Sequence, residues 1–153
     1  MIKVKVEEQD YEKVLKECWE NDEKLLKKWH ISSGKGLDEV LKNTMETLTE
    51  DTDKTTFNFY KIKDGNNIIG FFGHEIYMKE PFLTTFGVKP EFRSDDIKDK
   101  FFKVITNTIG NDFATFLYSK NTPAIHWLIK KGAVLKESLV VEGEEVVRLT
   151  FKN

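Results

Sequence analysis

The sequence has little that would tie it to an oxidising compartment or a membrane. Its 153 residues include one cysteine, Cys18, which cannot form an internal disulfide and fits a reducing setting. The most obvious apolar run, Ile68–Gly73, is far shorter than the roughly 20 residues of a membrane-spanning helix. The N-terminal stretch MIKVKVEEQD alternates apolar and charged residues and lacks the apolar core of a signal peptide. These absences predict a cytoplasmic protein with no membrane partner.

An excess of one charge sign is also missing. Lys and Arg number 24 against 26 Asp and Glu, for a net charge of −2, so no nucleic-acid partner is predicted. Cys18 and the three histidines, His30, His74 and His126, do not stand at metal-ligand spacing, so we predict no metal site. Twelve Phe and three Trp supply bulky core material, and the chain length predicts a single domain over residues 1–153.

Hydrophobic periodicity predicts a mixed α+β fold. Alternation and turn residues predict strands over 2–6, 55–63, 68–77, 82–88, 113–119, 133–141 and 144–151. Apolar stripes at helical spacing predict helices over 10–19, 37–48, 95–110 and 121–132, with a break at Asn21-Asp22. Glu80-Pro81 is expected to interrupt the chain before the strand at 82–88. That strand, the helix after it and the strand at 113–119 should form a right-handed parallel crossover among antiparallel hairpins.

Two segments of this succession carry recognisable motifs. The first, VKPEFRSDDIKDKFF (Val88–Phe102), runs from a strand end through Pro90 and Arg93 into a helix, whose N-terminal amides can hold a pyrophosphate. The second, NTPAIHWLIKKGA (Asn121–Ala133), follows the next strand and begins another helix.

These motifs resemble those of the GNAT family, the Gcn5-related N-acetyltransferases. The family usually has V-x-P-x-[YF]-[RQ]-x-x-G-x-[GA] at the end of the fourth strand, and often N-x-x-A-x-x-[FL]-Y-x-x-x-G-F after the fifth. The resemblance covers nearly the whole chain. It implies three layers: a mostly antiparallel, twisted central sheet with helices on both faces, and a parallel central strand pair that splays apart.

The resemblance also implies that acetyl-CoA lies in the gap between the splayed strands. Its pantetheine arm is expected to bond to the backbone of Phe86 and Val88. The full expected cofactor-binding set is Phe86, Val88, Arg93, Ser94, Asp95, Asp96, Ile97, Lys98 and Asn121. The implied function is transfer of an acetyl or other acyl group to a primary amine of a small molecule or a protein by direct attack.

The chain departs from the family pattern at three positions. Asp96 and Lys98 replace the two loop glycines, and Leu128 stands where a thiolate-protonating Tyr usually lies. Asp95 and Asp96 also suit the first turn of a helix, where they counter its dipole. The departures leave a second hypothesis open, a catalytically impaired GNAT-fold protein that serves as a binding or structural module.

The sequence offers few candidates for proton transfer. His74 and Glu75 are candidate bases near the end of their strand, on opposite faces because side chains alternate. The alternative is a solvated strand end. Tyr118 is the candidate acid in place of Leu128.

Two further questions stay open in the sequence. Trp29, His30 and Ser32-Ser33 could line an acceptor pocket, although core packing explains the tryptophan equally well. The protein could be a monomer or a homodimer paired through its last strands. Four residues serve either such pairing or the core of one copy: Leu139, Val141, Val146 and Leu149.

Overall fold

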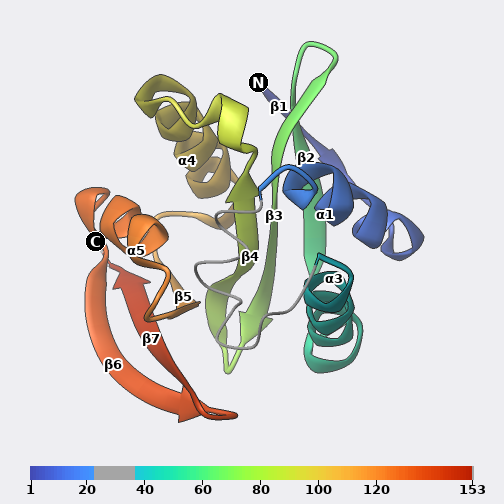
Figure 1. Cartoon of the computed structure of the whole chain (residues 1–153). Helices are drawn as coiled ribbons and strands as arrows, with labels where there is room; N and C mark the ends of the chain where they lie inside the picture. Colours follow the sequence, from blue (N-terminus) through green and yellow to red (C-terminus); the bar gives the residue numbers. More distant parts are fainter. Residues whose placement is uncertain (23–36, 153) are drawn as a thin grey trace.

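The computed structural model describes residues 1–22 and 37–152, which form a seven-stranded sheet in the order β1-β2-β3-β4-β5-β7-β6 (Figure 1). Trp29, His30 and Ser32-Ser33 lie outside the described residues. The strands are β1 (Ile2–Lys5), β2 (Asn58–Asp64), β3 (Asn67–Tyr77), β4 (Glu80–Val88), β5 (Phe113–Tyr118), β6 (Val134–Val141) and β7 (Glu144–Phe151). The described helices are α1 (Tyr11–Trp19), α3 (Leu37–Glu46), α4 (Asp95–Ile109) and α5 (Thr122–Lys130), with short turns η1 (Glu8–Asp10), η2 (Thr47–Asp51) and η3 (Pro90–Phe92).

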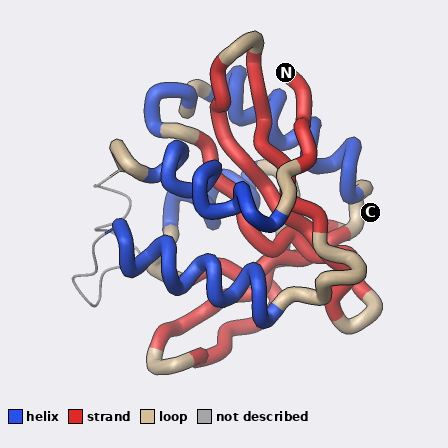
Figure 2. Tube along the Cα trace, turned by 90° about the vertical axis from the view of Figure 1, so that its right-hand side faces the viewer, coloured by secondary structure: helices blue, strands red, loops and turns tan. Residues whose placement is uncertain are grey.

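Helices cover both faces of the sheet (Figures 1 and 2). Alternation along β3 sends Phe71 into a core shared with α1 and α3, and sends Phe72 into a core shared with α4 and α5. All neighbouring strands are antiparallel except β4 and β5, which are parallel. The predicted α+β class and its three-layer arrangement are therefore confirmed.

Two strand boundaries differ from the prediction by more than one residue, the starts of β2 and β4. The strand expected at 55–63 begins at Asn58, because Asp53 first makes a turn. Its Oδ1 accepts hydrogen bonds from the amide of Thr55 at 2.9 Å and from the hydroxyl of the same residue at 2.6 Å. The amide of Phe57 then donates to the Asp53 carbonyl at 2.8 Å, which keeps the backbone out of the sheet until the next residue.

The expected interruption at Glu80-Pro81 is wrong. Both residues belong to β4, where Pro81 pairs with Ile76 of β3. The chain reverses instead at Met78 and Lys79, whose φ angles are 50° and 65°. This left-handed backbone is uncommon outside glycine, so the residue types gave little indication of the turn.

The parallel strands β4 and β5 are joined only near their starts. Phe82 pairs with Ala114 and Leu83 with Thr115, and no further residue of β4 pairs with β5. The Thr115 hydroxyl donates to the Leu83 carbonyl at 2.8 Å in a buried position and closes the base of the gap. Because β4 continues to Val88, the strands splay apart beyond this point, as the resemblance implied.

The strand β6, which forms one edge of the sheet, is exposed along its whole length. Leu149 of the neighbouring β7 is fully buried and belongs to the core of the single chain. Leu139 and Val141 are 38% and 50% exposed, so they remain available for contact with a partner. Whether the protein is a monomer or a homodimer stays a prediction.

Candidate functional site

A cavity of about 130 Å³ lies where β4 and β5 separate. Its wall combines the end of α1, the end of β4, the connection into α4 and the start of α5. We call it the cleft. The lining residues are Trp19, Phe86, Gly87, Val88, Arg93, Lys98, Asn121, Pro123, Ala124 and Trp127.

The backbone of β4 presents hydrogen-bonding groups to the cleft. The Lys89 amide donates to the Ile69 carbonyl of β3 at 2.8 Å, which fixes the phase of the antiparallel ladder. Groups directed at β3 alternate with groups directed away from it along such a ladder. The amides and carbonyls of Phe86 and Val88 therefore point toward the side on which β5 has separated.

The start of α5 forms an aromatic wall of the cleft with two polar groups in it. The ring of Trp127 lies 5.8 Å from that of Phe86 and 6.2 Å from that of Phe101. Within the described part of the chain, the buried Trp127 Nε1 has no hydrogen-bond partner. Asn121 is 5% exposed, and its side chain does not cap the helix that it precedes. Asn121 and Trp127 both line the cleft.

Arg93 is held at the edge of the cleft by two hydrogen bonds. Its Nε donates to the Val88 carbonyl at 2.8 Å, and Nη2 donates to Oδ2 of Asp22 at 2.5 Å. Asp22 follows the end of α1 and is 4% exposed, whereas the Arg93 side chain is 31% exposed. The guanidinium therefore joins α1 to the end of β4 while lining the cleft.

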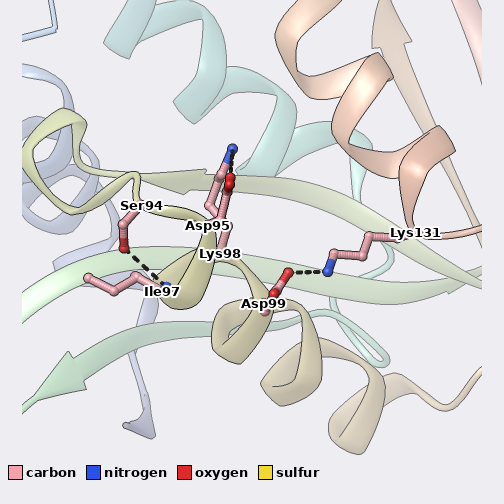
Figure 3. A network of polar contacts seen from close by, with 6 residues as sticks. All are labelled: Ser94, Asp95, Ile97, Lys98, Asp99 and Lys131. Atoms are coloured by element: carbon pink, nitrogen blue, oxygen red, sulfur yellow. Dashed lines mark hydrogen bonds and ion pairs between the residues drawn. The ribbon is translucent and has the colours of Figure 1, made fainter.

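In the first turn of α4, Asp95 pairs with Lys98 at 3.7 Å, and the two side chains lie on the same side of the helix (Figure 3). Ser94 Oγ caps the helix by accepting from the Ile97 amide at 3.2 Å. Asp95 and Asp96 lie in the first turn, as the dipole argument predicted, and their side chains are 93% and 76% exposed. Of these residues only Lys98 lines the cleft. Asp96 thus faces solvent, while Lys98 faces the cleft.

Glu75 is not part of a solvated strand end. Its side chain is 5% exposed, Oε2 accepts from the Asp53 amide at 2.8 Å, and Oε1 accepts from the Thr84 hydroxyl at 3.2 Å. Thr84 lies where the register between β3 and β4 shifts, directly after the last β4 residue paired with β5. Glu75 therefore ties a loop to the point where the strands separate.

His74 lies on the opposite face of the sheet from Glu75. Its ring stacks on those of Tyr60 and Phe72, with centroids 5.9 and 6.1 Å away, and it does not line the cleft. Burial lowers the pKa of His74, and the charge of Lys3 lowers it further.

This environment predicts a stability that falls on acidification. Because folding depresses the pKa of His74, its contribution is fully present above the unfolded value, about 6.5, and is lost as the pH falls below it. Melting temperatures measured between pH 8 and 5 should therefore decline less in a His74→Gln variant than in the wild type. The exposed His126, replaced by Gln, is the matched control and should leave the pH profile unchanged. Parallel profiles for wild type and His74→Gln would contradict this assignment.

Neither Tyr118, the candidate proton donor, nor Leu128, which it was predicted to replace in that role, lines the cleft. Tyr118 ends β5 and is 39% exposed, and burial raises its pKa with help from Glu144 and Glu142. Leu128 is fully buried in the core beneath α5. Leu128 therefore faces the core and not the cleft.

Sequence reasoning missed several cleft residues. The helical stripe of α1 predicts only a core position for Trp19, and Asn21-Asp22 predicts only a helix break. Gly87 and Pro123 also line the cleft without having been predicted. Of these missed residues, only Pro123 lies in a segment that carried a signal, the motif beginning at Asn121. No group of potential metal ligands occurs among residues 1–22 and 37–152, and none of the helices described there is long and apolar enough to cross a membrane.

Comparisons with known proteins agree with this geometry at the level of the fold. No protein-family model matches the sequence, and no curated protein matches it significantly. An acetyltransferase from Thermus thermophilus superposes with a TM-score of 0.70 at 11% identity, over 98% of this chain and 96% of that chain.

Two further solved structures match over nearly the whole chain. One is a Salmonella typhimurium acetyl transferase that modifies the N-terminal serine of 50S ribosomal subunit protein L7/L12, with a TM-score of 0.67, 11% identity and coverage of 99% and 94%. The other is the Vibrio cholerae spermidine N-acetyltransferase in complex with CoA and spermine, with a TM-score of 0.62, 16% identity and coverage of 98% and 94%. The chain therefore has the GNAT acetyltransferase fold.

Proposed function

We propose that the protein is an N-acyltransferase that binds acetyl-CoA, or another acyl-CoA, in the cleft and transfers the acyl group to a primary amine. The observation that carries this proposal is the splay of β4 from β5, which turns the backbone of Phe86 and Val88 toward a cleft edged by two cations, Arg93 and Lys98. A thioester lying along β4 would find hydrogen-bond partners for its amide arm and positive charge for its phosphates.

The diphosphate group of the acyl-CoA is bound mainly by side chains in this proposal. Arg93 and Lys98 supply charge, and the first-turn amides from Ser94 to Asp96 supply further donors at the positive end of α4. The Ile97 amide is already bonded to Ser94. Asn121 bonds to the ligand from the opposite wall.

The reaction follows from bringing an amine to the thioester. The amine nitrogen attacks the thioester carbonyl, an N–C bond forms, and the C–S bond breaks to release the CoA thiolate. The amine loses a proton to a base, for which Glu75 is the candidate through water, and the thiolate gains one from an acid, for which Tyr118 is the candidate. His74 is less suited to the role of base, because it lies on the face of the sheet that packs against α4 and it does not line the cleft. Positioning of the two substrates accounts for most of the rate.

A specific observation also supports the second candidate function, a GNAT-fold binding module. Leu128 is buried, and among the α5 residues that line the cleft only Trp127 has a side-chain N–H, which is not a useful acid. A thiol-release assay over a panel of small and peptide amines separates the two candidates. Release above the hydrolysis rate supports the enzyme, and CoA binding without any release supports the module.

Cofactor binding is tested by thermal stability. At a hundredfold excess over Kd, CoA or acetyl-CoA should stabilise the protein by about 3 kcal/mol, which raises Tm by roughly 6–10 °C. Lys98→Ala should reduce the shift, because it removes a cation that lines the cleft. Asp96→Ala is the matched control on the same helical turn, and it should not reduce the shift. No rise in Tm at millimolar ligand would overturn the proposal.

A further inference from the structure

Asp22 is a buried carboxylate whose position is fixed by α1. Its amide donates to the Trp19 carbonyl at 2.9 Å, so the residue continues the backbone path of the helix. The side chain is 4% exposed, and within the described residues its ion-pair partner is Arg93, 71 positions away in sequence. A charge buried to this degree persists only where a partner compensates it.

The same contact restricts Arg93. An arginine side chain has many rotamers, and the single bond from Nε to the Val88 carbonyl would leave the guanidinium free to tilt about that bond. The second bond, from Nη2 to Asp22, fixes the plane of the group. Two of its five N–H donors are then engaged, and three remain for a ligand in the cleft.

We propose that Asp22 is a positioning residue of the cofactor site, which holds the Arg93 guanidinium so that its remaining donors meet the diphosphate of the ligand. The assignment rests on the proposed function. It makes the affinity for the cofactor depend on how the end of α1 docks against the β4–α4 connection. A second ion pair, between Glu17 and Lys89 at 3.8 Å, links the same two segments, but Lys89 does not line the cleft.

A positioning role and a purely electrostatic role predict opposite changes in affinity. A carboxylate near a bound anion repels it, so removal of the charge alone would strengthen CoA binding. Loss of the acceptor that fixes Arg93 would weaken CoA binding, because the ligand would then have to immobilise a rotamer-rich side chain. Asp22→Asn removes the charge and keeps an acceptor oxygen, whereas Asp22→Ala removes both.

The test is calorimetric titration of CoA into the wild type, Asp22→Ala, Asp22→Asn and the control Glu17→Gln, each confirmed as folded from its melting curve. We expect Asp22→Ala to bind CoA about three- to tenfold more weakly, the effect of ordering one long side chain. Asp22→Asn should rescue the loss and bind at least as tightly as the wild type. Glu17→Gln should stay within about twofold of the wild type, since its partner contributes nothing to the cleft wall.

Each outcome decides a different claim. Unchanged or tighter binding by Asp22→Ala overturns the positioning role while the proposed function stands. Equal losses in Asp22→Asn and Asp22→Ala also overturn it, because the acceptor would then be irrelevant. Absence of CoA binding by the folded wild type overturns both the proposed function and this assignment. Asp22→Leu, which also removes the acceptor from Arg93, replaces the alanine variant if that variant does not fold, and the same result is expected.

Discussion

Replacing Arg93 with alanine should lower the free energy of unfolding by about 3 kcal/mol and weaken CoA binding more than tenfold. The variant leaves Asp22, 4% exposed, as an uncompensated buried charge, and loss of one partner of such a pair is far costlier than loss of both. The Val88 carbonyl also loses its side-chain donor. The affinity falls because a charge-assisted donor disappears from the cleft. Urea denaturation and calorimetric titration measure the two effects.

The matched control for this prediction is Lys89→Ala. Lys89 belongs to the same connection and also pairs with α1, but its partner Glu17 has a side chain 44% exposed, so the loss should stay below about 1 kcal/mol. The double variant Asp22→Ala/Arg93→Ala should be more stable than Arg93→Ala alone, because it removes the orphaned carboxylate. Equal stabilities for the Arg93 and Lys89 variants would show that the buried pair contributes no more than an exposed one.

The fold could be predicted from the sequence because its helices and strands have clear periodicities. Phe71 and Phe72 fall on opposite faces by simple alternation, and Leu37 and Leu41 recur at helical spacing. The errors came from turns that depend on individual contacts. Asp53 delays β2 through its own side-chain bonds, and Met78 with Lys79 adopts positive φ without the usual residue types. Alternation and helical spacing carry no information about either feature.

The cleft could be predicted only in part. The two motifs contain Val88, Arg93, Lys98 and Asn121, and the family resemblance added Phe86; all five line the cleft. The ion pair of Asp22 and Arg93 and the contact of Glu75 with Asp53 join residues far apart in sequence. Neither residue type nor spacing identifies such partners. These contacts depend on how α1 and the loop after η2 pack against the sheet.

Helical geometry places Asp96 and Lys98 on different sides of α4. Asp96 and Lys98 are two residues apart, which on an α-helix separates their side chains by about 200°. Asp96 and Lys98 therefore cannot both face the cleft, because the segment is helical. In the structure Lys98 faces it and Asp96 pairs with Lys100 at 3.2 Å on the exposed side. Lys98, which also pairs with Asp95 at 3.7 Å, thus places a positive charge at the cleft, which favours a phosphate-bearing ligand.

Replacing Gly70 with alanine should cost about 3 kcal/mol or more of unfolding free energy and should disrupt CoA binding. Gly70 of β3 pairs with Val88 of β4, at the strand end that forms the cleft wall. An added Cβ would overlap the carbonyl oxygen of Gly87 and lie 3.2 Å from the Val88 Cα. Both are backbone atoms, so no rotamer change relieves the clash and the strands must move apart.

The comparison that tests this argument is Gly65→Ala in the β2–β3 turn. An added Cβ there meets nothing within 4 Å, and φ is +63°. The free energy of unfolding should therefore fall by only about 1 kcal/mol, from left-handed backbone strain. Its CoA affinity should equal that of the wild type, because the turn does not contact the cleft. Denaturation and titration of both variants give the outcome. If Gly70→Ala were as stable as Gly65→Ala and bound CoA normally, β4 would have room to shift, and the close backbone approach would not set the shape of the cleft.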